Sequence, residues 1–116
     1  MAIQDEIKKA IGAHGLWKAR LRGAIDTGKS EWPVDTVAKD NQCEFGRWIH
    51  SLPAGGAHVA KVKDLHAKFH VEAASVLKLV EGGQKDAARQ AIAAGSKFDR
   101  LTNDLTKELM EWSKAA

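Results

Sequence analysis

One cysteine and three histidines are the residues of this chain best suited to chemistry. Cys43 is the single cysteine among 116 residues and lies in the stretch D-N-Q-C-E-F-G-R-W, positions 40–48. His66 and His70 are four residues apart, a spacing that places two imidazoles on one helix face, where they can bind one metal ion. His14 falls in an otherwise apolar helical repeat. A lone cysteine is most often a small buried hydrophobe, but these four side chains make a complete N₃S ligand set for tetrahedral zinc.

The sequence disfavours a catalytic role for the histidines. A zincin protease needs H-E-x-x-H, with the glutamate as general base, whereas Ala67 follows His66. Four protein ligands also leave no open position on the metal for a substrate, so the pattern predicts that the chain is not an enzyme. His50 and His58 flank a Pro/Gly-rich break, and we expect them at the surface, outside the site.

The first half of the chain must provide helices that carry His14 and Cys43. Apolar or aromatic residues recur every three or four positions, which is typical of an amphipathic helix: Ile3, Ile7, Ala10, His14, Trp17, Leu21 and Ala24. Gly28 and Pro33 are expected to end this helix. A short helix is predicted from about Asp40 to His50, with Asp40 as its N-cap. Cys43 would then lie in the first turn, where free N–H groups and the helix dipole favour a thiolate.

The second half predicts two more long helices. The first runs from about His58 to Glu81 and has the repeat Val59, Val62, His66, Phe69, Ala73, Val76 and Val80. The second runs from about Gln84 to Trp112 after the Gly82-Gly83 turn. No segment alternates with a period of two, so no strand is expected. The sequence predicts one all-α domain over 1–116, an antiparallel four-helix bundle with three long helices and one short cysteine-bearing helix. Three tryptophans are expected in its core: Trp17, Trp48 and Trp112.

The composition excludes several classes of function. The chain has 44% hydrophobic and 28% charged residues, and its net charge of +3 arises from 18 Lys/Arg scattered among 15 Asp/Glu. A nucleic-acid-binding protein would concentrate its cations on one face, so no nucleic-acid partner is predicted. No stretch approaches the roughly 18 apolar residues of a membrane span, and the N-terminus has no signal-peptide core. We therefore predict a cytoplasmic protein without membrane insertion.

Three motifs together resemble the bacterial chemoreceptor zinc-binding (CZB) domain. They are H-G-L-W, D-N-Q-C-E-F-G-R-W and H-A-K-F-H, in this order. The family's pattern is a histidine on the first helix, a C-x-[LF]-G-x-W motif and a late H-x-x-x-H. Phe45 stands where many members have leucine. The resemblance covers about residues 5 to 112 and implies a four-helix fold with Zn²⁺ held by His14, Cys43, His66 and His70.

The resemblance also implies a regulatory function. Members are often homodimers and are typically attached to chemotaxis receptors or diguanylate cyclases, which makes these the expected signalling partners. In some members the zinc–cysteine unit is a redox switch for hypochlorous acid or a sensor of zinc itself. Asp40 is a candidate for a supporting position beside the metal ligands, because hydrogen bonds near the sulfur tune its reactivity.

Two alternatives remain open from the sequence. One is a hemerythrin-like di-iron or oxygen-binding bundle, which would need further histidines and inward-facing carboxylates. The apolar repeats supply no carboxylate beside His14 or His66. The other alternative is a metal-free helical interaction module.

Overall fold

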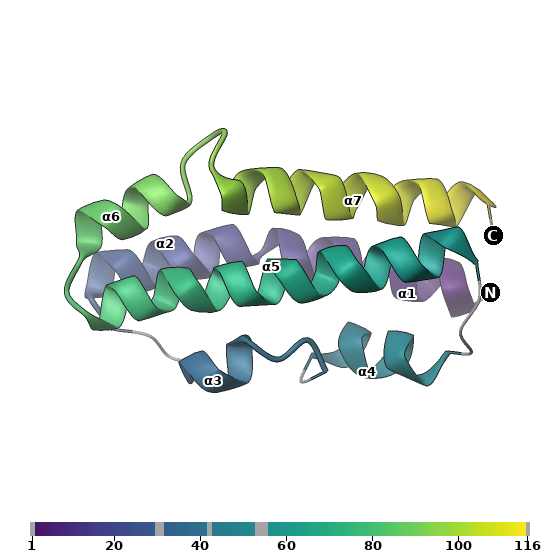
Figure 1. The fold of residues 1–116 in the computed structure, drawn as a ribbon, viewed down its shortest axis with the longest axis horizontal. Coiled ribbons are helices and arrows are strands. Elements are labelled where there is room, and N and C mark those ends of the chain that lie inside the picture. The colour runs from purple at the N-terminus through teal and green to yellow at the C-terminus, as the bar shows by residue number, and fades with distance from the viewer. Residues whose placement is uncertain (1, 30–31, 42, 53–55, 116) are drawn as a thin grey trace.

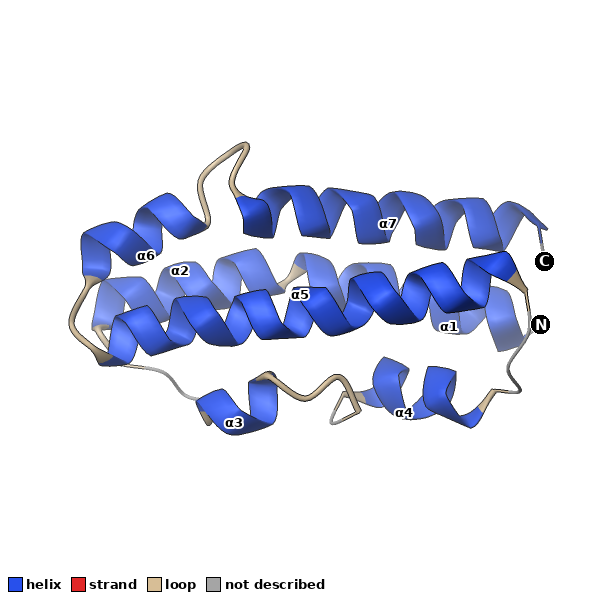
Figure 2. Cartoon of the chain, viewed as in Figure 1, coloured by secondary structure: helices blue, strands red, loops and turns tan. Residues whose placement is uncertain are grey.

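The computed structural model describes residues 2–29, 32–41, 43–52 and 56–115. Within these ranges every regular element is a helix (Figure 2), which confirms the all-helical class. The helices are α1 (Ala2–Gly15), α2 (Trp17–Thr27), α3 (Val34–Val37), α4 (Glu44–Ser51), α5 (Ala57–Glu81), α6 (Lys85–Ala91) and α7 (Lys97–Ala115).

The helices form an elongated bundle around α5. Figure 1 shows α1 followed by α2 in one row and α6 followed by α7 in another. In that view α3 and α4 lie below α5, on the side opposite to α6 and α7. The central helix packs against α2, α3, α4, α6 and α7, and α1 packs against α4 and α7. The bundle measures 43 × 25 × 19 Å along its principal axes. In the part of the chain that the structure describes, no helix combines the length and the apolar character that crossing a membrane requires.

The first and the last of the three long helices predicted from the sequence are each interrupted in the structure. The first predicted helix is divided at Leu16 into α1 and α2. Helical backbone hydrogen bonds nevertheless continue across the break, from Leu16 N to Gly12 O (3.2 Å) and from Arg20 N to Leu16 O (3.0 Å). The last is divided more completely, because Gly95 adopts a positive φ of 81°. Ser96 Oγ then accepts from the Asp99 N–H (3.2 Å), and the Asp99 carboxylate accepts from the Gly95 N–H (2.9 Å). This reciprocal capping arrangement begins α7 as a new helix.

The start of the cysteine-bearing helix also differs from the prediction. Asp40 is not its N-cap. Cys43 takes that position, with φ −90° and ψ 159°, and its sulfur accepts a hydrogen bond from the Gly46 N–H at 3.2 Å. The Asp40 carboxylate lies instead 3.0 Å from Nε2 of His50, at the far end of the same helix. The Pro/Gly break predicted after His50 lies at residues 53–55, outside the described residues.

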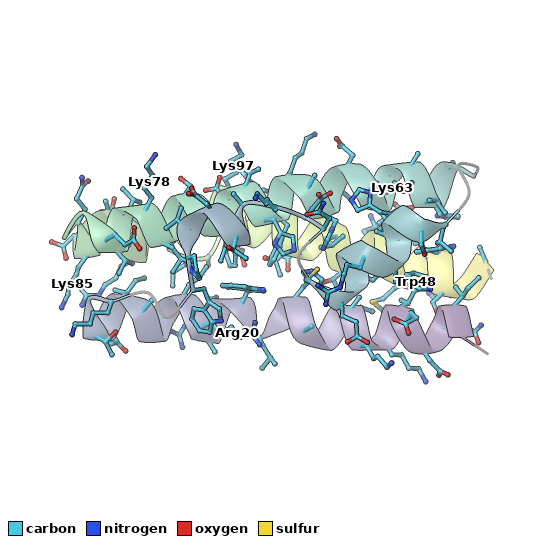
Figure 3. All side chains as sticks on the ribbon, turned by 90° about the horizontal axis from the view of Figure 1, so that it is seen from below. Arg20, Trp48, Lys63, Lys78, Lys85 and Lys97 are labelled. Atoms are coloured by element: carbon cyan, nitrogen blue, oxygen red, sulfur yellow. The ribbon has the colours of Figure 1, made fainter. Side chains whose placement is uncertain are left out.

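The core is apolar and draws side chains from almost every helix. Its largest fully buried side chains include Phe69, Phe98, Leu77 and Leu105. Trp17 and Trp112 are buried, as predicted. Trp48 is only partly buried and packs on Trp112, with ring centroids 5.7 Å apart. Figure 3 shows Trp48 on α4, on the side of the bundle from which that view is taken.

A close backbone contact makes Gly46 the critical glycine of this arrangement. A Cβ at Gly46 would lie 1.6 Å from the Asp40 carbonyl oxygen, whereas one at Gly23 would have no neighbour within 4 Å. Gly46→Ala should therefore destabilise the protein by about 1–3 kcal/mol, the usual cost of overpacking. Gly23→Ala should stabilise it by roughly 0.5–1 kcal/mol, because alanine favours a helix interior. Chemical denaturation measures both; equal stability of the two variants would contradict the close approach of the Asp40 carbonyl to α4.

Candidate metal centre

Four side chains from three parts of the fold converge inside the bundle. His14 lies near the end of α1, Cys43 caps α4, and His66 and His70 lie one turn apart on α5. One ligand atom from each residue lies within 4.8 Å of all the others. The structure thus brings together all four residues that the sequence predicts as metal ligands.

The distances between the ligand atoms suit a zinc ion. Nε2 of His66 lies 3.0 Å from Nε2 of His14 and 3.0 Å from Nε2 of His70. The Cys43 sulfur lies 3.4 Å and 3.6 Å from Nε2 of His66 and His70. Zinc bonds of about 2.0–2.1 Å to nitrogen and 2.3 Å to sulfur imply tetrahedral edges of about 3.3 Å (N to N) and 3.6 Å (N to S). The four atoms therefore surround a space of the right size for the ion.

Backbone carbonyls orient two of the imidazoles. Nδ1 of His14 lies 2.7 Å from the Ala10 carbonyl oxygen, and Nδ1 of His70 lies 3.0 Å from that of Val37. A carbonyl oxygen only accepts, so each Nδ1 must carry the proton, and each Nε2 directs a lone pair into the centre. This is the second contact that metal-binding histidines usually make. Nε2 of His66 lies 3.0 Å from both of these nitrogens; a proton on His66 can serve only one of them, whereas a metal ion can bind all three.

His66 lies at the middle of the group. Its Nε2 is close to the ligand atoms of all three other residues, and the residue is fully buried. Its Nδ1 has no hydrogen-bond partner among the described residues. A buried polar atom without a partner costs about 1–3 kcal/mol, so the interactions at Nε2 must hold this ring in place.

Burial keeps the histidines in the neutral form that binds metal. The pKa of His14 is lowered to about 4 and that of His66 to about 2, chiefly by loss of solvent and in smaller part by the neighbouring histidines. Burial also lowers the pKa of His70, against the opposing effect of the Val37 carbonyl. All three imidazoles are therefore neutral at pH 7 in the metal-free protein.

The thiol behaves differently from the sequence expectation. Burial raises the pKa of Cys43, and this effect exceeds the lowering by the Gly46 N–H bond. The helix start alone therefore does not make a thiolate here, contrary to what a first-turn position predicts. A bound cation would supply the missing stabilisation, because a thiol that coordinates a metal ion loses its proton.

Aromatic rings enclose the group. The His14 ring makes edge contacts with Phe45 and Phe69, at centroid distances of 5.8 Å and 5.2 Å, and Phe45 also packs on His66 at 5.1 Å. Both phenylalanines are buried. The apolar shell limits the access of water and strengthens the interactions between the ligands and a cation.

The remaining histidines lie outside the group. His50 is exposed and pairs with Asp40. His58 is partly exposed and lies 2.7 Å from Glu108, a buried carboxylate that also pairs with Lys61 at 3.3 Å.

The carbonyl of Val37 is a partner of the site that was not predicted. The signal for α3 was present in P-V-D-T-V, where a proline and an early aspartate are typical of a helix start. That signal predicts the helix, but not the contact between its last carbonyl and His70.

A comparison with protein families supports the zinc assignment. The family model for the chemoreceptor zinc-binding domain matches residues 14–77, more than half of the chain. The matched segment contains all four converging residues. The search of curated proteins and the search of solved structures returned no match. Zinc is therefore the cofactor that the family match and the four-residue group both indicate. The chain belongs to the chemoreceptor zinc-binding domain family.

Proposed function

We propose that this chain is a zinc-binding regulatory domain of bacterial signalling, in which Cys43 couples the state of the metal site to the position of α4. The observation that carries this proposal is the convergence of four ligand atoms within 4.8 Å, one of them on the residue that caps α4. His14, Cys43, His66 and His70 are the proposed ligands. A bound Zn²⁺ would be a closed four-coordinate centre that links α1, α4 and α5 and adds its binding free energy to the stability of the fold.

The proposed mechanism assigns different roles to the ligands. The carbonyls of Ala10 and Val37 hold His14 and His70 with their lone pairs inward. Four protein ligands leave no place for a substrate, which supports a regulatory rather than a catalytic role. Asp40 holds the turn that carries Cys43, through its carboxylate on His50 and its carbonyl against Gly46.

Cys43 is the proposed redox-sensitive ligand. In the reaction with hypochlorous acid, the thiolate sulfur takes the hydroxyl oxygen, the O–Cl bond breaks, and chloride leaves with the electron pair. The sulfur is oxidised to a sulfenic acid, which is a poorer ligand than the thiolate. The same atom accepts the Gly46 N–H bond that begins α4. Oxidation thus weakens the metal site and the helix start together, and movement of α4 is the proposed signal.

We further propose the setting that the family resemblance implies. It comprises a homodimer in the cytoplasm whose output partner is a chemotaxis receptor or a diguanylate cyclase. The di-iron alternative is not supported, because the converging group contains no carboxylate. The metal-free module is not favoured either, because the proton of a neutral His66 can bridge to only one of the His14 and His70 nitrogens that face it.

The first prediction concerns the metal content. Protein purified without a histidine tag should bind one zinc per chain. His70→Ala should lower zinc affinity by more than about 100-fold, since loss of even a supporting contact costs 10–100-fold. The variant should also lose the rise in melting temperature that zinc gives the wild type. His58→Ala is the matched control, because His58 lies outside the group and pairs with Glu108, and it should bind zinc as the wild type does. Unchanged zinc content in His70→Ala would exclude the proposed ligand set.

The second prediction concerns oxidation. Hypochlorous acid should release zinc from the wild-type protein to a chromogenic chelator, with formation of one sulfenic acid per chain by mass spectrometry. Cys43→Ser should bind zinc more weakly, and its remaining zinc should respond much less to the oxidant. Zinc release at the wild-type rate from Cys43→Ser would refute the redox mechanism and leave the zinc site intact.

The third prediction concerns pH and metal-free protein. The pKa of His14 is lowered from 6.5 to about 4 on folding, so between these values the unfolded chain binds a proton that the folded chain does not. The free energy of unfolding should be highest above pH 6.5 and should fall as the pH decreases toward 4. Lowering the pH from 7.5 to 5 should reduce the free energy of unfolding by about 2 kcal/mol for each deeply buried histidine. Urea denaturation measures this, and His14→Gln should show a shallower dependence. A wild-type stability that is flat over this range would contradict the burial of neutral imidazoles.

A further inference from the structure

A hollow of about 120 Å³ connects the surface with the proposed zinc site. It lies between α1, α2 and the start of α4, and both His14 and Cys43 line it. Lys9 and Glu44 line it as well, and their side chains are 61% and 75% exposed. One end of the hollow is therefore open to solvent, and the other reaches two of the four converging residues.

Cys43 is the most exposed of the four converging residues, and it lines the hollow. His14, His66 and His70 are at most 4% exposed, whereas Cys43 is only half-buried. The Gly46 N–H and the two α5 imidazoles lie close to the sulfur. The hollow thus gives access to the one ligand that reacts with electrophiles.

Small side chains on α1 keep the hollow open, and its volume limits what can use it. Ala10 and Ala13 are three residues apart and both line it. A volume of about 120 Å³ holds several water molecules. A compact small solute therefore fits, and a peptide or a large aromatic group does not.

The charges around the hollow balance. Lys9 Nζ lies 3.5 Å from Glu6 and 4.0 Å from Glu44, so it bridges α1 and α4. Arg20 stacks over the Trp17 and Trp32 rings, at 5.1 Å and 5.5 Å from their centroids, and Figure 3 shows it beside α2. Two cations and two carboxylates give no net charge to attract ions of either sign. Exposed ion pairs of this kind are weak, so the Lys9 bridge does not close the opening.

We infer that this hollow is the route by which small uncharged electrophiles reach the Cys43 sulfur, and that its size excludes bulky ones. The inference rests on the proposed function, because it specifies which class of solute acts on the proposed zinc ligand. Small neutral oxidants belong to the admitted class, whereas protein and peptide disulfides belong to the excluded class.

Two maleimides of different size test the route on zinc-loaded protein. In each addition an S–C bond forms as the C=C π bond breaks, and the second alkene carbon takes up a proton from water. The chain has one cysteine, so mass spectrometry of the intact protein follows the reaction directly. After division by the rate with free glutathione, N-methylmaleimide should react at least about tenfold faster than N-(1-pyrenyl)maleimide, since access controls thiol reactivity.

A pair of alanine variants tests the position of the route. Ala13→Leu should fill the hollow and slow the reaction with N-methylmaleimide by about fivefold or more, at unchanged zinc content. Ala19→Leu is the matched control, because Ala19 is exposed on α2 and does not line the hollow; its rate should equal that of the wild type. Lys9→Ala removes the bridge across the opening and should not slow the reaction.

The outcomes separate the inference from the proposed function. Equal normalised rates for the two maleimides, or a wild-type rate in zinc-loaded Ala13→Leu, would overturn the route. A wild-type protein that binds no zinc would overturn the proposed function instead, and the same rates would then decide the route for the free thiol.

Discussion

The structure depends on the convergence of four polar side-chain atoms inside the bundle. Three imidazole nitrogens and one sulfur lie 3.0–3.6 Å apart in the closest pairs, in a shell of phenylalanine rings. Burial holds the three imidazoles neutral at pH 7. The single proton of a neutral His66 can bridge to only one of the inward-facing nitrogens of His14 and His70. A cation would bind all four atoms at once.

The same requirement explains the less regular features around the site. α3 is a single turn of helix, but its last residue supplies the carbonyl that orients His70. The turn before α4 approaches that helix so closely that residue 46 must be glycine. This approach places Cys43 at the helix start, where its sulfur is both one of the four converging atoms and a hydrogen-bond acceptor for Gly46. A change at the sulfur would therefore affect the converging group and the local backbone together.

Sequence reasoning predicted which four residues converge, because their signals are local and chemically specific. The i,i+4 histidine pair and a histidine in an apolar repeat need only helical periodicity to be interpreted. The N-cap was misplaced by three residues, since aspartate is a common cap and a cysteine cap is not expected from propensity. The break at Gly95 was missed because the alanine-rich stretch before it favours a helix, whereas the Ser96–Asp99 capping pair favours a new start. The carbonyl partners of His14 and His70 could not be predicted, because they depend on how separate helices pack.

X-ray absorption at the zinc edge of the purified protein is the most direct test of the central claim. With one zinc per chain, the account predicts three nitrogen neighbours at about 2.0 Å and one sulfur at about 2.3 Å. The sulfur shell should disappear in Cys43→Ser. A wild-type spectrum with only nitrogen and oxygen neighbours would show that Cys43 is not a ligand and would contradict the account.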